Sequence, residues 1–162
     1  MLYIWGPRRS GKTTLLDKLR RRLKVEKFNF DLESDREKFG PRKEVLERIV
    51  KENRVILIDE IQNYPEATVI LKLLHDEFKV KVIATGSSEL RQKSKDFDTM
   101  AGRFTEIFCL PLSVFEIAGS GKVLASARVS YERNLAQTLQ IFGSYPEVYT
   151  AEHNSETVRI DL

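Results

Sequence analysis

The stretch that decides the fold stands near the start of the chain and reads Gly6-Pro7-Arg8-Arg9-Ser10-Gly11-Lys12-Thr13. It fits the phosphate-binding pattern G-x-x-x-x-G-K-[ST] at every position. A short apolar run at residues 2–5 precedes it, and a leucine-rich helical stretch begins near Thr14. Strand, glycine loop and helix follow one another, so the glycines can let successive backbone N–H groups point at an anion. The positive end of the helix adds to that attraction.

The loop therefore predicts a nucleoside triphosphate site. Lys12 is placed to reach the β- and γ-phosphates, and Thr13 to hold Mg²⁺ through its hydroxyl. The residues of this segment that we expect to bind the nucleotide are Gly6, Pro7, Arg8, Arg9, Ser10, Gly11, Lys12, Thr13 and Thr14.

Apolar periodicity predicts strands that alternate with helices after the loop. The expected elements are a helix over the leucines at 15–23, a strand at 28–32 closed by a loop at 31–35, a helix at 41–52, a strand at 55–58, a helix at 66–78, strands at 80–84 and 105–110, and a helix from Ser126. The four apolar residues at 55–58 are typical of a strand buried on both faces. This order predicts an α/β fold with a doubly wound parallel sheet and right-handed crossovers.

Two acids, Asp59 and Glu60, directly follow the strand at 55–58. An apolar strand that ends in this pair is the Walker B arrangement. We expect Asp59 to contact Mg²⁺ or a water bound to it. Glu60 points differently and can polarise a water aimed at the γ-phosphate, which makes it the expected catalytic base beside Lys12. Ligands bind beyond the carboxyl ends of parallel strands, so both motifs are expected at one edge.

Two further sets of residues are candidates for sensing the γ-phosphate. Thr85, Ser87 and Ser88 follow the strand at 80–84, where a hydroxyl can reach the γ-phosphate or the attacking water. Thr85 or Ser87 is preferred and the sequence does not choose between them, and small hydroxyl residues are also common turn formers. Arg103 is either an arginine finger, acting on its own nucleotide or a neighbour's, or one half of a structural salt bridge.

Composition places the chain among globular proteins. It has 162 residues, 41% of them apolar, with a net charge of +3 and one cysteine, Cys109. The lone cysteine excludes an internal disulfide and suits a reducing cytosol. No apolar stretch approaches the roughly 20 residues of a membrane helix. We therefore expect a cytoplasmic protein without a membrane partner.

Several short motifs follow one another in a fixed order. They are Ile4-Trp5 with the loop and Thr14-Leu15, then Ile58-Asp59-Glu60-Ile61-Gln62, Ala84-Thr85-Gly86-Ser87-Ser88, Ala101-Gly102-Arg103, Pro111-Leu112-Ser113-Val114-Phe115-Glu116 and Gly143-Ser144-Tyr145-Pro146-Glu147. This order resembles that of the prokaryotic AAA-type P-loop ATPases. The resemblance implies a five-stranded sheet of order 5-1-4-3-2, with ATP as the nucleotide. It also implies a larger protein with a C-terminal nuclease-like or DNA-binding domain.

The leading hypothesis is Mg²⁺-dependent ATP hydrolysis coupled to a conformational change. The expected organisation is an ATPase core at residues 1–125 and a truncated helical C-terminal segment at 126–162, so that the chain is either a truncated protein or an excised ATPase core. An alternative is an ATP-dependent binding module for DNA or a protein partner, motivated by Arg20-Arg21-Arg22 and by the trio Arg91, Lys93 and Lys95. The arginine run also fits a solvated helix face. A small-molecule kinase is less favoured, because the Asp59-Glu60 pair favours water as the acceptor. The sequence leaves open whether the protein forms a homo-oligomer.

Overall fold

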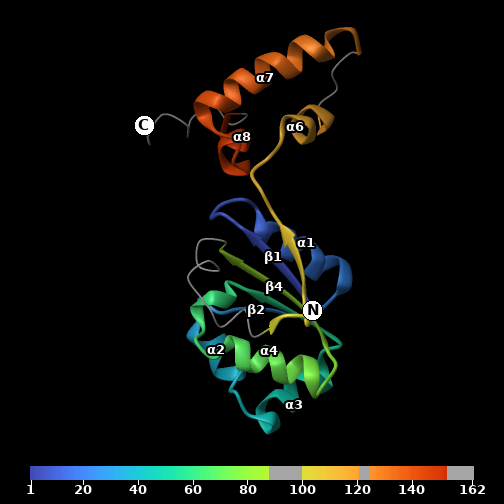
Figure 1. The fold of residues 1–162 in the computed structure, drawn as a ribbon, viewed down its shortest axis with the longest axis vertical. Helices are drawn as coiled ribbons and strands as arrows, with labels where there is room; N and C mark the ends of the chain where they lie inside the picture. The colour runs from blue at the N-terminus through green and yellow to red at the C-terminus, as the bar shows by residue number, and fades with distance from the viewer. Residues whose placement is uncertain (88–99, 121–124, 153–162) are drawn as a thin grey trace. The chain divides into compact units, whose positions relative to one another are not determined.

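The computed structural model describes residues 1–87, 100–120 and 125–152. It consists of two compact units (Figure 1). The first unit comprises Met1–Arg8 and Lys12–Cys109, and the second comprises Arg9–Gly11 and Leu110–Leu162. Each unit has its own secondary structure.

The first unit is built on one sheet of five strands. They are β1 (Leu2–Gly6), β2 (Lys27–Asn29), β3 (Val55–Asp59), β4 (Lys81–Ser87) and β5 (Thr105–Phe108). The strand order is β2-β3-β4-β1-β5, and every neighbouring pair is parallel. Taken from the other edge, this is the order 5-1-4-3-2. The predicted α/β P-loop fold class is therefore confirmed.

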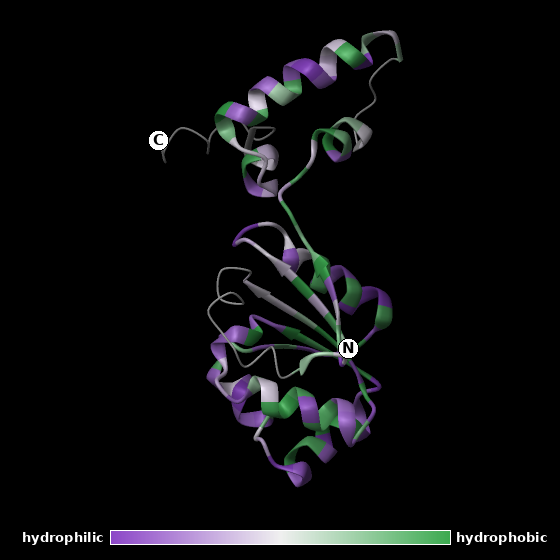
Figure 2. Cartoon of the chain, in the orientation of Figure 1, coloured by the Kyte–Doolittle hydropathy of each residue, from purple (hydrophilic) through white to green (hydrophobic). Residues whose placement is uncertain are grey.

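Helices cover both faces of this sheet. They are α1 (Lys12–Leu23), α2 (Glu33–Lys38), α3 (Lys43–Glu52) and α4 (Ala67–Asp76). The connection from β1 to β2 crosses the sheet in the direction opposite to the later connections, so right-handed crossovers place α1 on one face and α2, α3 and α4 on the other. Figure 1 shows this division. In Figure 2 these helices carry both hydrophobic and hydrophilic residues, as helices that cover one face of a sheet do.

Aromatic residues fill the core between the sheet and α4. Tyr3 and Trp5, both fully buried on β1, stack with ring centroids 5.1 Å apart. Trp5 pairs in register with Gly86 of β4. A Cβ atom at Gly86 would lie 2.5 Å from the Trp5 ring, which is closer than real carbon contacts allow. The indole therefore requires glycine at position 86.

Two expectations about local structure are corrected. Residues 31–35, expected as a loop after a strand at 28–32, instead lead into α2, and β2 ends at Asn29. The chain turns there because Asp35 accepts a hydrogen bond from the backbone N–H of Asn29, and Arg36 donates to the carbonyl of Phe30. The second correction is that β4 continues to Ser87, so Thr85 and Ser87 are strand residues and not turn formers.

The secondary-structure elements that the structure describes in the second unit are all helical. It contains α6 (Val114–Ser120), a short 3-10 turn (Ala125–Ala127), α7 (Arg128–Phe142) and α8 (Pro146–Glu152). The expected helix after Ser126 is confirmed, whereas α6 and α8 were not predicted. None of the α7 side chains is buried. Within the described ranges, no helix combines the length and the apolar character needed to cross a membrane.

Candidate nucleotide-binding site

The loop between β1 and α1 begins at Gly6 and ends where the helix starts at Lys12. Two of its residues, Arg9 and Gly11, have positive φ angles of 64° and 93°. Left-handed residues between right-handed ones turn successive N–H groups toward the same side, which makes an anion-binding concavity. At Gly11 the absence of a side chain removes the strain of that conformation.

Lys12 is buried, with only 5% of its surface exposed. Its Nζ donates to the carbonyl oxygens of Gly6 and Pro7, at 3.0 and 2.7 Å. The ammonium is therefore held back over the start of the loop. Thr13 and Thr14 are exposed in the first turn of α1, as are Arg8 and Arg9 in the loop, while Ser10 is buried.

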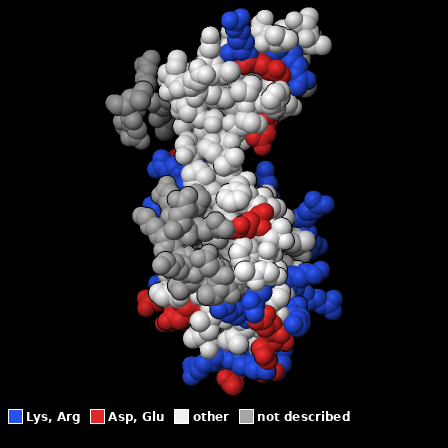
Figure 3. Space-filling view, viewed as in Figure 1, with Lys and Arg blue, Asp and Glu red and all other residues white. Residues whose placement is uncertain are grey.

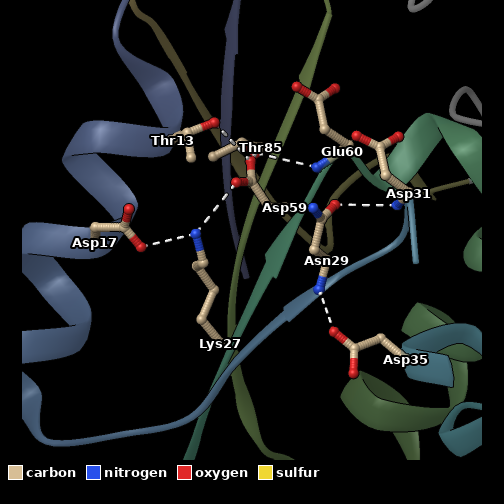
Figure 4. Close-up of polar contacts among 9 residues, drawn as sticks. All are labelled: Thr13, Asp17, Lys27, Asn29, Asp31, Asp35, Asp59, Glu60 and Thr85. Atoms are coloured by element: carbon tan, nitrogen blue, oxygen red, sulfur yellow. Dashed lines mark hydrogen bonds and ion pairs between the residues drawn. The ribbon is translucent and has the colours of Figure 1, made fainter.

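Asp59 is a buried carboxylate at the end of β3, with 1% of its surface exposed. Its Oδ1 accepts hydrogen bonds from Thr85 Oγ1 and, at 3.4 Å, from Thr13 Oγ1 (Figure 4). Its Oδ2 lies 3.5 Å from the Nζ of Lys27. A buried charge needs such partners because it has lost its hydration. The contacts bring β3, β4, α1 and β2 together at one point.

Glu60 has a left-handed backbone, with φ 53° and ψ 47°. This conformation sends its side chain away from the course of β3. Its backbone N–H donates to Thr85 Oγ1 at 3.3 Å, and its Oε2 accepts a hydrogen bond from Gln62 Nε2. The other end of the Gln62 amide accepts from the backbone N–H of Ser87 at 3.2 Å. Gln62 thus links Glu60 to the end of β4.

The structure distinguishes Thr85 from Ser87. The Thr85 hydroxyl is fully buried and engaged with both Asp59 and Glu60. Ser87 is 2% exposed, and its Oγ has no hydrogen-bond partner among the residues that the structure describes. It pairs in register with Gly6, the first residue of the loop. The third candidate, Ser88, lies outside the described residues.

Arg103 is not brought together with the loop. It precedes β5, and its carbonyl accepts a hydrogen bond from the Met1 ammonium, so it lies at the amino ends of the strands. The loop starts from the opposite, carboxyl end of β1. The Arg103 guanidinium pairs with Asp76 at the end of α4, with Nη2 3.0 Å from Oδ2. This partner, with help from His75, lowers the pKa of Asp76 from 3.8 to about 2. Of the two interpretations, the structure contains the salt bridge.

Three residues at this edge were not predicted from the sequence: Asp17, Lys27 and Gln62. Lys27 Nζ lies 2.7 Å from Asp17 Oδ1, and this ammonium lowers the pKa of the Asp17 carboxyl below its usual value. A signal for Lys27 was available, because Lys27 and Asn29 alternate with Phe28 and so face the other side of the strand. Gln62 belongs to one of the quoted motifs, but the sequence did not predict its contacts, since they depend on the left-handed turn at Glu60.

The donor atoms fit a magnesium ion better than a softer metal. Thr13 and Asp59 supply hard oxygen ligands 3.4 Å apart. Mg²⁺ is usually held by one or two carboxylates together with substrate phosphates and waters. In the described part of the chain, no group of three or more His, Cys, Asp or Glu side chains converges to hold a metal ion. A metal here would therefore depend on the nucleotide for further ligands.

A parallel sheet of this order, with a G-x-x-x-x-G-K-T loop between a central strand and a helix, defines a P-loop nucleotide-binding protein. The family model described as AAA domain matches residues 1–118. The match spans well over half of the chain, which therefore belongs to that family, and residues 1–118 form an ATPase-like nucleotide-binding domain. No curated protein matches the sequence.

Proposed function

We propose that this domain hydrolyses ATP in the presence of Mg²⁺, and that loss of the γ-phosphate changes the conformation of neighbouring segments. One observation supports this most directly. Asp59 at the end of β3, Glu60 directly after it and Ser87 at the end of β4 meet at the edge where β1 ends at Gly6. A loop that binds phosphates, an acid for a metal and a second acid for a water are thus gathered at one edge.

Each residue has a distinct role in the proposed reaction. Lys12 binds the β- and γ-phosphates as a point charge, and Thr13 and Asp59 would hold Mg²⁺, which neutralises charge on the triphosphate when bound. Glu60 accepts a proton from the water whose oxygen forms a bond to the γ-phosphorus, as the bond to ADP breaks. The Gln62 amide fixes one oxygen of Glu60 and leaves the other for that proton.

The proposed conformational coupling runs through Ser87. Its buried hydroxyl can donate to a γ-phosphate oxygen, and its backbone N–H already holds Gln62. Gln62 in turn holds Glu60. Release of the γ-phosphate would remove one contact from this chain of hydrogen bonds, and such a loss is a known way to shift a segment between two arrangements.

Nucleotide affinity tests the first step of the proposal. Lys12→Ala is expected to weaken ATP binding at least about a hundredfold, since a buried charge-assisted contact is lost. The matched control is Lys18→Ala, which removes an exposed lysine from the same helix. Titration of a fluorescent ATP analogue measures both variants. Equal affinity of the Lys12 variant and the parent protein would remove the loop from the proposal.

A second candidate is an ATP-dependent binding module for DNA. Arg20, Arg21 and Arg22 form the last turn of α1 and are all exposed, and Figure 3 shows Lys and Arg side chains on the flank where α1 lies. The trio Arg91, Lys93 and Lys95 lies outside the described residues. DNA affinity with and without ATP, measured across a salt series, tests this version, because phosphate contacts give a steep salt dependence. A kinase would differ from both by releasing no phosphate without an added acceptor.

The division of the chain and a role for Arg103 are proposed as well. An ATPase core at 1–125 and a helical segment at 126–162 remain the proposed division, with a C-terminal nuclease-like or DNA-binding domain as the proposed continuation. A role for Arg103 in a neighbour's site would require a homo-oligomer and release from Asp76. Turnover per chain that rises with protein concentration, and no longer does so in Arg103→Ala, is the expected sign of that arrangement.

A further inference from the structure

Lys27 places a positive charge beside the proposed metal ligands. It is the first residue of β2, and only 15% of its side chain is exposed. Its Nζ lies 2.7 Å from Asp17 Oδ1 and 3.5 Å from Asp59 Oδ2 (Figure 4). The ammonium therefore bridges a carboxylate of α1 and a carboxylate of β3.

The bridge follows from the strand register. Lys27 pairs with Leu57, and Asn29 pairs with Asp59. The Lys27 side chain thus leaves β2 two residues before the level of Asp59, and its flexible four-carbon stem reaches along the strand to the carboxylate. A shorter or rigid side chain at position 27 would not make this contact. The result is a cation directed at the residue that would also face Mg²⁺.

Two cations at one carboxylate repel each other, more strongly where water is excluded. Asp59 is almost fully buried, and Thr13, its other partner toward the loop, approaches the same carboxylate. A site shaped only for the highest Mg²⁺ affinity would not contain Lys27. Another role must therefore account for Lys27. Its position allows it to neutralise the buried carboxylate of Asp59.

We propose that Lys27 is a positioning residue that competes with Mg²⁺ for Asp59 and withdraws to Asp17 when the metal is held, so that it sets the metal affinity of the site. This inference rests on the proposed function. Asp17 is suited to receive the ammonium, because it lies four residues after Thr13 and so on the same face of α1. It is also the closer of the two partners already.

The test compares nucleotide affinity with Mg²⁺ and with EDTA, using a fluorescent ADP analogue and the full chain. The dissociation constant measured in EDTA, divided by the one measured with Mg²⁺, reports how much the metal contributes to nucleotide binding. Lys27→Met is expected to raise this ratio at least about tenfold, which is the effect of one unit charge on a divalent ion at roughly 6 Å in bulk water and is larger where water is excluded. Asp17→Asn is expected to lower it, since the ammonium then has only Asp59.

The matched control is Lys38→Met. Lys38 also pairs with a carboxylate, Asp35, at 2.9 Å, and its removal changes the net charge equally. Its ratio is expected to equal that of the parent protein. Trp5 fluorescence verifies that each variant is folded. If Lys27→Met does not fold, the ratio of Asp17→Asn alone tests the role of Lys27.

The outcomes separate this inference from the proposed function. A parent ratio of one means that Mg²⁺ does not assist nucleotide binding, and it overturns both. A parent ratio well above one, with Lys27→Met at or below it or Asp17→Asn unchanged, overturns the role of Lys27 and leaves the proposed function standing.

Discussion

Replacing Thr85 with valine tests whether one hydroxyl holds Asp59 and Glu60 in place. The side chain is fully buried, and its Oγ donates to Asp59 Oδ1 while it accepts from the backbone N–H of Glu60. Valine has nearly the same shape and no hydroxyl. The substitution therefore removes two hydrogen bonds and leaves the packing almost unchanged, although it is not a neutral exchange.

The magnitude follows from what is left unpaired. A hydrogen bond to a charged group contributes about 1.5–3 kcal/mol, and a buried N–H without a partner costs about 1–3 kcal/mol. Asp59 retains Thr13 at 3.4 Å and Lys27 at 3.5 Å, so part of the first loss is recovered. We expect Thr85→Val to lower the free energy of unfolding by about 3 kcal/mol. Thr85→Ser keeps the hydroxyl and should lose about 1 kcal/mol, the value of one buried methyl group.

Urea unfolding followed by tryptophan fluorescence measures both variants. The chain has one tryptophan, Trp5, buried on β1 within the first unit, so the signal reports on the sheet that carries the site. The valine variant should unfold at a clearly lower urea concentration than the serine variant. If the two unfold together, the hydroxyl does not stabilise the acids and the reasoning is wrong.

Three further predictions concern other contacts of the first unit. Gly86→Ala should lower the free energy of unfolding by about 1–3 kcal/mol, because the new Cβ meets the Trp5 ring and the packed core yields little. Arg103→Met should make the free energy of unfolding depend less on pH in the acid range. In the parent protein Arg103 lowers the pKa of Asp76. The stability that this ion pair contributes is therefore present above the usual pKa of 3.8 and is lost as the pH falls toward about 2. Gln62→Leu should lower kcat about tenfold or more with little change in ATP affinity, since Gln62 orients Glu60.

Each of these predictions has a direct comparison. Gly119→Ala is the control for Gly86→Ala, because a Cβ at Gly119 meets nothing within 4 Å and should not destabilise the protein. For Arg103→Met, urea unfolding between pH 7 and pH 2 should show an advantage of the parent protein that shrinks below about pH 4. An advantage that is constant with pH contradicts the assignment. For Gln62→Leu, an equal loss of affinity and turnover would indicate a general disturbance of the site.

The sequence was sufficient for the fold because its signals are local. The apolar run at 55–58 forms β3, with residues 56–58 buried, and the loop between β1 and α1 needs only its own glycines and lysine. By contrast, α2 was missed. It contains no buried residue, and contacts of Asp35 and Arg36 with the backbone of preceding residues accompany it. Apolar periodicity, on which the prediction rested, carries no signal for such a helix.

The sequence motifs predicted several residues of the candidate site, but not which of them contact one another. Thr85 and Ser87 look equivalent in the sequence, yet the Thr85 hydroxyl contacts Asp59 and the left-handed Glu60, whereas the Ser87 hydroxyl, level with Gly6, has no hydrogen-bond partner among the described residues. Lys27 and Asp17 are ten residues apart and meet only because β2 passes α1. Arg103 precedes β5, so whether it lies near the loop depends on the direction in which β5 runs beside β1. Tertiary placement decides each of these, and no local pattern encodes it.

A single-turnover experiment tests the central claim most directly. Excess protein is mixed with labelled ATP and Mg²⁺, and the bound and the hydrolysed fractions are measured over time for the parent protein and for Glu60→Gln. The account predicts that both bind ATP, that the parent converts it to ADP and phosphate, and that the variant does so about 100 to 10,000 times more slowly, as expected when a general base is lost. Hydrolysis by Glu60→Gln at the parent rate, or no ATP binding by the parent protein, would contradict it.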